Sequence, residues 1–329
     1  MEAIARAHTN IALIKYWGKR NTQLFLPTNS SLSITLDHFY TETKVQFSDR
    51  FEKDSLILDG SQVSDREIWK ITAFLDHVRN IAGTKAFAKV TSVNHVPTAA
   101  GFASSASGYA ALAAAASKAL QLGLTGTELS ALARQGSGSA SRSIFGGFVE
   151  WQKGEKTDGT DSFATQILDE KAWDLSVLSV VVEAGPKSVS SRDGMQRTVE
   201  TSPFYAGWLA TVDEDLQQMK EAINARDFTK LGEIAEANAM KMHATTLGAK
   251  PPFLYWQSAT LDVMQQVMEL RQQGLEAYFT IDAGPNVKVL CKPEQEHIIK
   301  EKLAAVASVR DVVVCHPGPG IQYLSEWVG

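Results

Sequence analysis

Two alternating stretches near the N-terminus form the clearest pattern of hydrophobic and polar positions in this chain. Residues 3–16 and 31–47 include SLSITL and TETKVQF, in which β-branched and polar side chains alternate, so both stretches are predicted to be strands. A helical pattern follows at 65–82, and another strand is predicted at 86–93. The first part of the chain is therefore expected to mix strands and helices.

The remaining elements follow the same two periodicities. An Ala-rich helix is predicted over about 105–121, and LTGTELSALARQ predicts a second helix because a Thr start precedes an acidic residue and apolar spacing. FGGFVEW and LSVLSVVVE are predicted strands. Long amphipathic helices and short strands make up the second half. Helices are expected at 203–224, 228–244, 256–272 and 294–306, and strands at EAYFTI, NVKVLC and VRDVVVC.

The segment 183–195, EAGPKSVSSRDGM, is rich in Gly, Pro and Ser and marks the best domain boundary. We expect an N-terminal domain over 1–183 and a C-terminal domain over 184–329. Both would be of the α+β class. Ligand clefts commonly lie between such domains, so a cleft is expected at their interface.

The composition is typical of a globular protein, with 44% hydrophobic and 21% charged residues. Cys291 and Cys315 lie in apolar runs and are interpreted as reduced core residues, which favours the cytoplasm. The longest run of small apolar residues, AALAAAA at 110–116, is far too short to span a membrane. Met1 leads directly into a patterned segment, so no signal peptide is expected.

The positions of the charged residues along the chain are more informative about the ligand than the net charge is. A net charge of −5 argues against nucleic acid or an anionic membrane as the main partner. Residues 77–149 contain one acid, Glu128, where a uniform spread would place about eight. Residues 3–36 contain none but keep Arg6, Lys15, Lys19 and Arg20. Burial would explain the missing acids but not the retained cations, so we predict a small polyanionic ligand.

The segment from Pro97 to Ser107, PTAAGFASSAS, runs directly into the Ala-rich helix. Small residues at a loop-to-helix junction let backbone N–H groups approach a ligand, and a helix start favours an anion. The same residues would also suit an ordinary helix capped by Ser104 or Ser105. A Walker A loop is excluded because Gly-Lys-Ser/Thr is absent.

Two further clusters carry cations. In ARAHTNIALIKYWGKR, basic residues lie on or beside the first strand, where they would either protect an exposed edge or line a partly buried site. The candidates in this cluster are Asn10, Lys15, Tyr16, Lys19 and Arg20. RQGSGSASRSIFGG at 134–147 is either a flexible linker or a loop whose Arg142 binds a carboxylate in bidentate fashion.

A third cluster, FTIDAGPNVKVL, places Asp282 between an apolar strand and a Gly-Pro turn. Aspartate in a turn usually caps the backbone. Beside a phosphate cleft it would instead be a candidate base, kept ionised by a nearby lysine.

Together these blocks resemble the GHMP kinase superfamily. Its PxxxGLxSSA phosphate loop is matched by Pro97 to Ala106, and the N-terminal and DAGPN blocks resemble its mevalonate diphosphate decarboxylase branch. The resemblance covers the whole chain. It implies a two-domain GHMP kinase-like fold, with an N-terminal domain like ribosomal protein S5 domain 2 and an α+β C-terminal domain.

The resemblance also implies a reaction, the ATP-dependent decarboxylation of mevalonate 5-diphosphate. Asp282 would orient or deprotonate the C3 hydroxyl, and Lys15 would keep Asp282 charged. Arg142, with Asn10, would bind the carboxylate that leaves. The residues implied to grip the substrate diphosphate are Tyr16, Lys19, Ser137, Ser139, Ser191 and Arg192.

On the nucleotide side, the resemblance implies that backbone amides of 101–107 cradle the ATP phosphates. The Ser105 hydroxyl would lie near Mg²⁺, and Ser92 and Asn94 would contact the nucleoside. Separately from the resemblance, Gly185, Pro186 and Gly194 flank a basic stretch, which predicts a mobile lid over 183–195 whose Lys187 reaches the ATP phosphates on closure. The full set expected to contact ATP is Ser92, Asn94, Gly101, Ala103, Ser104, Ser105, Ala106, Ser107 and Lys187.

Two other functions remain open. A GHMP small-molecule kinase would stop at phosphoryl transfer, but kinases of that superfamily usually carry a catalytic Asp in the loop where this chain has GSGSASRS. A non-catalytic nucleotide-binding regulator could keep the phosphate loop yet lose its base, and the presence of Asp282, Lys15 and Arg142 argues against it. A homodimer is expected because dimers are the commonest assembly.

Overall fold

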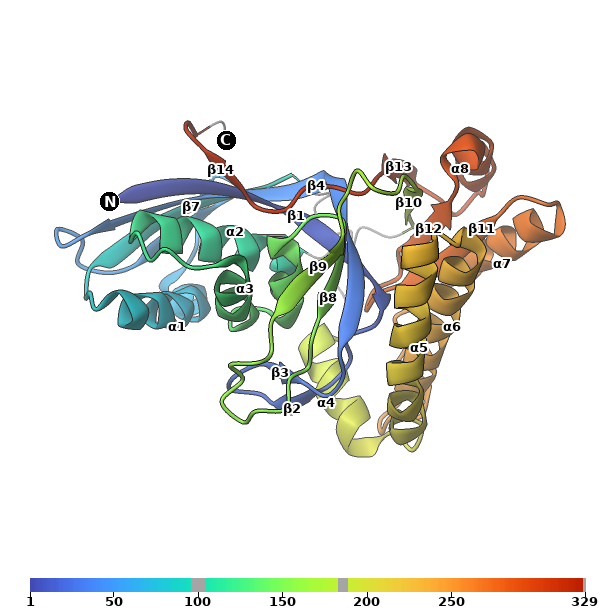
Figure 1. Cartoon of the computed structure of the whole chain (residues 1–329), viewed down its shortest axis with the longest axis horizontal. Coiled ribbons are helices and arrows are strands. Elements are labelled where there is room, and N and C mark those ends of the chain that lie inside the picture. Colours follow the sequence, from blue (N-terminus) through green and yellow to red (C-terminus); the bar gives the residue numbers. More distant parts are fainter. Residues whose placement is uncertain (96–103, 183–188, 328–329) are drawn as a thin grey trace.

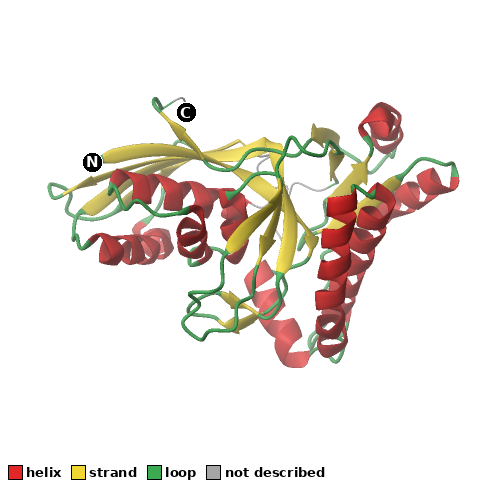
Figure 2. Ribbon diagram, viewed as in Figure 1, coloured by secondary structure: helices red, strands yellow, loops and turns green. Residues whose placement is uncertain are grey.

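Two β-sheets, each packed against helices, organise the chain (Figures 1 and 2). A computed structural model describes residues 1–95, 104–182 and 189–327. The expected α+β composition is confirmed, since helices and strands both recur along the chain.

The first sheet has eight strands and belongs mainly to the N-terminal half. Its strands are β1 (Glu2–Ile14), β4 (Ser31–Ser48), β5 (Ser55–Leu58), β6 (Ser61–Gln62), β7 (Phe87–His95), β8 (Phe148–Trp151), β9 (Ala164–Leu168) and β14 (Gln322–Leu324). The order is β14-β1-β4-β7-β5-β6, and β8 joins β4 to β9. Because β14 comes from the end of the chain, the C-terminal segment returns to the N-terminal sheet.

Helices α1 (Asp65–Ala82), α2 (Ser104–Ala119) and α3 (Gly126–Arg134) lie together along this sheet (Figure 1). The alanines of α2 at 110–116 are buried, and their short side chains let the helix backbone approach β1 and β4 closely. The 3₁₀ helix η1 (Gly138–Ile144) follows α3 and packs on α2. A small hairpin, β2 (Lys19–Asn21) and β3 (Leu26–Pro27), extends from the end of β1.

The second sheet is antiparallel, in the order β11-β12-β10-β13. These strands are β10 (Ser176–Val181), β11 (Ala277–Ile281), β12 (Val287–Cys291) and β13 (Asp311–Cys315). Alternate side chains point to opposite faces. Phe279 and Val289 pack with α7 (Ser258–Gln272) and α8 (Glu296–Ala304), which the short η2 (Pro293–Gln295) precedes. Tyr278 and Leu290 face α5 (Tyr205–Ala225) and α6 (Phe228–Leu247).

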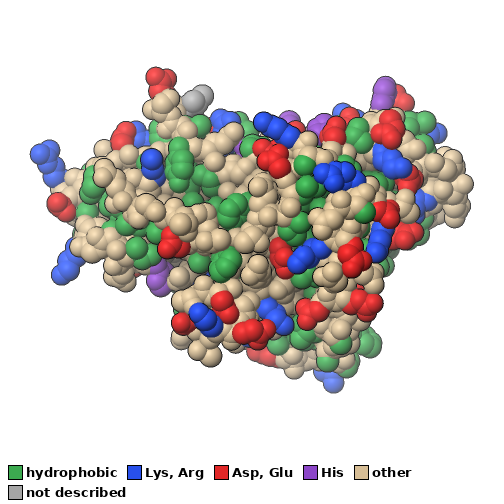
Figure 3. All heavy atoms as spheres, viewed as in Figure 1, with side chains coloured by type: hydrophobic (Ala, Val, Ile, Leu, Met, Phe, Trp, Pro, Cys, Tyr) green, Lys and Arg blue, Asp and Glu red, His purple; other side chains and the backbone are tan. Residues whose placement is uncertain are grey.

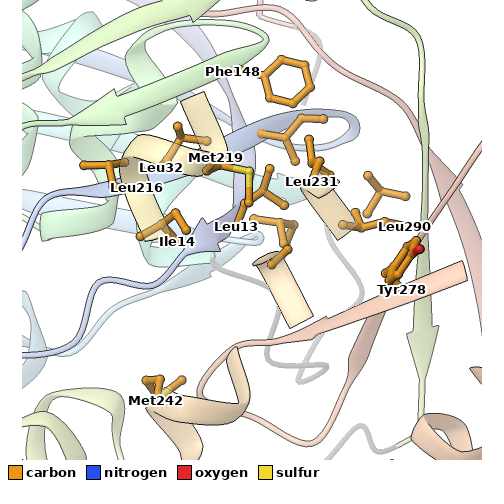
Figure 4. Packing of buried hydrophobic residues seen from close by; sticks show 14 of the residues in the cluster. Leu13, Ile14, Leu32, Phe148, Leu216, Met219, Leu231, Met242, Tyr278 and Leu290 are labelled. Carbon is orange, nitrogen blue, oxygen red and sulfur yellow. The ribbon is translucent and has the colours of Figure 1, made fainter. Parts of the chain in front are cut away.

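One hydrophobic cluster joins the two halves of the chain (Figure 4). Its side chains come from the first sheet, from α5 and α6, and from the second sheet. The labelled members are Leu13, Ile14, Leu32, Phe148, Leu216, Met219, Leu231, Met242, Tyr278 and Leu290. A shared core of this kind holds the ends of β1 and β11 in a fixed relation.

The segment 183–195 differs from its expected irregular structure. Residues 183–188 lie outside the described residues, but α4 (Ser191–Thr201) begins soon after them. Ser190 caps α4 by accepting the N–H of Asp193 at 3.1 Å. Gly194 is compatible with this helix. The start of α4 is not predicted from composition, because Ser and Gly residues also suit a loop.

The pairing of β10 bears on the expected domain boundary. β10 pairs with β12 and β13 in the second sheet, so the chain changes sheet before residue 176. The division between 183 and 184 stays a prediction, and this pairing favours a division between β9 and β10. No helix in the described ranges is both long and apolar enough to cross a membrane.

Candidate active site

The ends of β1 and β11 place a lysine and an aspartate together. Lys15 donates from Nζ to Asp282 Oδ1 at 2.6 Å and to the carbonyl of Ala12 at 2.8 Å. The Lys15 side chain is 3% exposed and that of Asp282 is 31% exposed. Burial lowers the pKa of Lys15, and the negative charge of Asp282 opposes this shift. The pair therefore offers an open carboxylate backed by a buried cation.

Amide side chains hold the backbone of Lys15 on both sides. The Lys15 N–H donates to Asn238 Oδ1 at 2.8 Å, and Asn29 Nδ2 donates to the Lys15 carbonyl at 2.8 Å. Asn238 in turn donates to Asp215 Oδ2 at 2.8 Å. Helices α5 and α6 of the C-terminal half thus fix a residue of the N-terminal strand.

His243 of α6 supports the peptide that precedes Asp282. Its Nε2 lies 3.1 Å from the carbonyl oxygen of Ile281, which can only accept a hydrogen bond. Burial lowers the pKa of His243 to about 4, so the neutral ring donates this hydrogen bond.

Arg142 projects from η1 into the same region. Its Nε and Nη2 donate to Asn10 Oδ1 at 3.2 and 3.1 Å, and its Nη1 donates to Ser31 Oγ at 2.6 Å. Burial lowers the pKa of Arg142 to about 10, against the opposing charge of Asp282. The 134–147 segment is therefore not a flexible linker, and the described hydrogen-bond partners of its arginine, Asn10 and Ser31, are both neutral.

A cleft of about 360 Å³ brings most of the predicted residues together. Its described lining includes one acid, Asp282, and five cations. The cations are Lys15, Lys19, Lys70, Arg142 and Arg192. By contrast, acidic and basic side chains are interspersed over the face seen in Figure 3. Lys15 and Arg142 are buried and Lys19 is half-buried, and such an excess of positive charge over one acid suits a polyanion.

All six residues expected at the diphosphate line this cleft. Ser137 and Ser139 approach each other at 3.3 Å between their hydroxyl oxygens. Burial, and then the charge of Arg192, lower the pKa of Lys19 to about 8. Tyr16 is nearly buried, has no hydrogen-bond partner for its hydroxyl among the described residues, and has a pKa raised by burial. Ser191 and Arg192 occupy the first turn of α4.

Only some of the residues predicted to contact the ATP phosphates lie in the described part of the chain. Gly101, Ala103 and Lys187 lie outside the described residues. Ser104 starts α2, and Ser105 in the first turn is exposed to the cleft.

The next two predicted residues of this turn face inward. Ala106 and Ser107 are buried, and the Ser107 hydroxyl lies 2.7 Å from the Thr41 hydroxyl. This contact ties the start of α2 to β4.

Ser92 and Asn94 lie on β7. Ser92 is buried against Thr43, with 2.9 Å between their hydroxyl oxygens. Asn94 receives a hydrogen bond from Thr41 and donates its N–H to Asp59 Oδ1 at 2.7 Å. Neither belongs to the described lining, so their nucleoside role stays a prediction.

The lining also contains residues that the sequence does not single out, among them Lys70, Tyr109 and Phe25. Lys70 lies on α1, in a helical pattern whose polar positions offer nothing to distinguish it. Tyr109 lies on α2 four residues after Ser105, so helical periodicity could have found it. Phe25 lies in the hairpin after β1, and no motif marks it.

The fold and the cleft define an enzyme whose site suits a polyanionic ligand and contains one carboxylate, Asp282, in its described lining. Family models then match both halves of the chain. Residues 7–164 match a model described as the diphosphomevalonate decarboxylase-like N-terminal domain, and residues 177–317 match the mevalonate 5-diphosphate decarboxylase C-terminal domain. The chain belongs to the diphosphomevalonate decarboxylase family.

Individual relatives agree with this assignment. A diphosphomevalonate decarboxylase of Candida albicans is 36% identical over 355 residues, covering 98% of each chain. The solved mevalonate diphosphate decarboxylase of Enterococcus faecalis is 51% identical, with a TM-score of 0.92, over 98% of this chain and 99% of that one. A structure described as MDDEF in complex with MVAPP, AMPPCP and magnesium gives the same identity, TM-score and coverage. The resemblance to this family and the two-domain fold are thereby confirmed.

Proposed function

We propose that this chain catalyses the ATP-dependent decarboxylation of mevalonate 5-diphosphate. The products are isopentenyl diphosphate, ADP, phosphate and CO₂, which places the enzyme in the mevalonate pathway of isoprenoid biosynthesis. The observation that carries this proposal is the 2.6 Å contact of Asp282 with Lys15 in a cleft that also holds Arg142. Membership of the diphosphomevalonate decarboxylase family supports the same conclusion.

The reaction first needs a better leaving group than a tertiary hydroxyl. Asp282 accepts the proton of the C3 hydroxyl as that oxygen bonds to the γ-phosphorus of ATP, while the bond to the ADP oxygen breaks. Lys15 keeps Asp282 ionised before this step. The Asp282 side chain is exposed toward the cleft, which suits contact with a bound hydroxyl.

Loss of CO₂ follows from the phosphorylated intermediate. The C3–O bond breaks and phosphate leaves with the bonding electron pair. The C1–C2 bond then breaks, its electrons form the C2–C3 double bond, and C1 departs as CO₂. Arg142, fixed by Asn10 and Ser31, would hold the carboxylate so that the C1–C2 bond is aligned with the emptying orbital at C3.

The diphosphate would bind to the positive charge and hydroxyl groups of the cleft lining. Lys19 and Arg192 supply charge there. Tyr16, with a buried unpartnered hydroxyl, supplies a donor, and so do Ser137, Ser139 and Ser191. Phosphate oxygens accept hydrogen bonds from all of these groups.

The nucleotide would lie against the start of α2. AMPPCP and magnesium in the solved relative support ATP and Mg²⁺ as the cofactors. The Ser105 hydroxyl is open to the cleft and is an oxygen donor of the kind Mg²⁺ accepts. Mg²⁺ held there would supply positive charge that offsets the negative charge developing on the phosphoryl oxygens. Backbone amides of 101–107 and the side chain of Lys187 would contact the phosphates, and Ser92 and Asn94 remain the predicted nucleoside contacts.

The test is incubation with ATP and mevalonate 5-diphosphate labelled with ¹⁴C at the carboxyl carbon. We expect ADP and labelled CO₂ in equal amounts. ADP without CO₂ would identify a small-molecule kinase instead. ATP binding without turnover of any mevalonate derivative would identify a nucleotide-binding regulator.

Assembly and location are also part of this proposal. We expect a homodimer, since two-fold dimers are the commonest assembly, and light scattering of the purified protein would test it. A cytoplasmic location is supported by Cys291 and Cys315, which are buried free thiols.

A further inference from the structure

Phe25 lies where two cations of the cleft approach each other. Its ring centre is 4.6 Å from Lys19 Nζ and 5.5 Å from Arg192 Cζ. Both distances fall within the range of about 6 Å over which an aromatic ring attracts a cation. Lys19 belongs to β2 and Arg192 to α4, so one ring contacts a cation from each half of the chain.

The backbone of Phe25 has an unusual conformation for an aromatic residue. Its φ of +54° lies in the left-handed region, which favours glycine or asparagine. Asn21 Oδ1 accepts the N–H groups of Gln23 and Leu24 at 2.9 Å and so closes the turn, while Leu26 is buried beyond it. A bulky residue kept in this conformation indicates that its side chain contributes something glycine would not.

Neither cation is neutralised by a carboxylate. Within the described ranges, Lys19 and Arg192 form no ion pair with an acidic side chain, and they repel each other. The position of α4 is nevertheless fixed, because Trp17 Nε1 donates to Thr198 Oγ1 at 2.8 Å. The Phe25 ring attracts both cations and offsets part of their repulsion.

We infer that Phe25 is a positioning residue that holds Lys19 and Arg192 together for the diphosphate group of the substrate. The ring keeps both cations converged before the substrate arrives, so less ordering remains to be done on binding. This inference rests on the proposed assignment of Lys19 and Arg192 to the diphosphate.

A series of fluorinated phenylalanines at position 25 tests the inference. Each fluorine withdraws electron density from the ring face with little change in ring shape. We expect the KM for mevalonate 5-diphosphate to rise stepwise with one, two and three fluorines. The total rise should be about 3- to 30-fold, from the usual strength of a cation–π contact. The KM for ATP and kcat should stay within about twofold.

Two substitutions bracket this series. Phe25→Leu removes the ring and should raise the KM for mevalonate 5-diphosphate at least as much as three fluorines do. Phe25→Tyr keeps an aromatic ring, so its KM for mevalonate 5-diphosphate should stay close to the wild-type value. Phe51→Leu is the matched control, because Lys89 Nζ lies 4.5 Å from the Phe51 ring outside the cleft. This control should leave both KM values and kcat unchanged.

The result that would overturn the inference is a KM that stays constant across the fluorine series. An equal change in kcat and in both KM values would also overturn it, since that points to a general structural role. Lys19→Ala and Arg192→Ala separate this from failure of the proposed function. If neither raises the KM for mevalonate 5-diphosphate, the assignment of the cations is wrong. If both do but the fluorine series does not, only the role of Phe25 is wrong.

Discussion

Replacing Asp282 with Asn is the sharpest perturbation of the proposed chemistry. The variant keeps the shape of the side chain and an oxygen that Lys15 can reach, but it removes the negative charge and the base. Proton transfer by a positioned side chain contributes roughly 100- to 10,000-fold, so kcat should fall by that factor. The KM for mevalonate 5-diphosphate and the affinity for ATP should stay within a few-fold, because neither diphosphate nor nucleotide contacts depend on this carboxylate.

The same substitution should also cost stability. Lys15 is 3% exposed and would lose the carboxylate 2.6 Å from its Nζ, which should lower the free energy of unfolding by about 1–3 kcal/mol at pH 7. Burial already lowers the pKa of Lys15, and losing Asp282 lowers it further. The unfolded chain then binds more protons between that lowered pKa and the ordinary lysine value. Relative to the wild type, the deficit should therefore shrink as the pH rises from the Lys15 pKa of the variant to the higher, though still lowered, Lys15 pKa of the wild type.

Steady-state kinetics, ATP titration and thermal unfolding at two pH values check both parts. Asp76→Asn is a matched control, since Asp76 also pairs at 2.6 Å, with Arg79, but is 59% exposed. It should leave kinetics and stability close to wild type. A kcat within tenfold of wild type for Asp282→Asn, or equal losses in kcat and both affinities, would show that Asp282 only caps the turn.

Three further predictions concern other parts of the site. Arg142→Lys loses the two hydrogen bonds that the guanidinium group donates to Asn10 Oδ1. The kcat/KM for mevalonate 5-diphosphate should therefore fall about 100-fold with an unchanged KM for ATP. Equal effects on both substrates would refute this prediction. The pKa of Lys19 is about 8, so the wild-type KM for mevalonate 5-diphosphate should rise above pH 8 as the charge is lost, while Lys19→Arg should flatten this profile. Gly18→Ala should destabilise by about 2–4 kcal/mol in denaturant unfolding, because φ is +113° and a Cβ would lie 2.0 Å from the Tyr205 hydroxyl.

Local patterns predicted most elements because each depends on a few neighbouring residues. The expected strands at 3–16 and 31–47 correspond to β1 and β4, and the helix at 65–82 has the bounds of α1. The local pattern does not predict the helix α4, because its first turn, SRDG, has the composition of a loop. The short β14 was missed because its pairing partner, β1, lies at the other end of the chain.

The sequence by itself determined the family, the α+β class and the kinds of side chain expected in the site. Those follow from motif order and from the removal of acids around the cationic segments. It could not show that the GSGSASRS segment is a buried helix, since Gly and Ser suit a linker equally well.

Only the tertiary structure decided which groups act together. Lys15 and Asp282 are 267 residues apart, and their contact depends on α5, α6 and both sheets sharing one core. The same packing brings Arg192 of α4 to the Phe25 ring and places Asp282 as the one acid among five cations in the described lining of the cleft. Periodicity reports the face a residue occupies, whereas charge pairing and burial arise from segments that meet only in the folded chain.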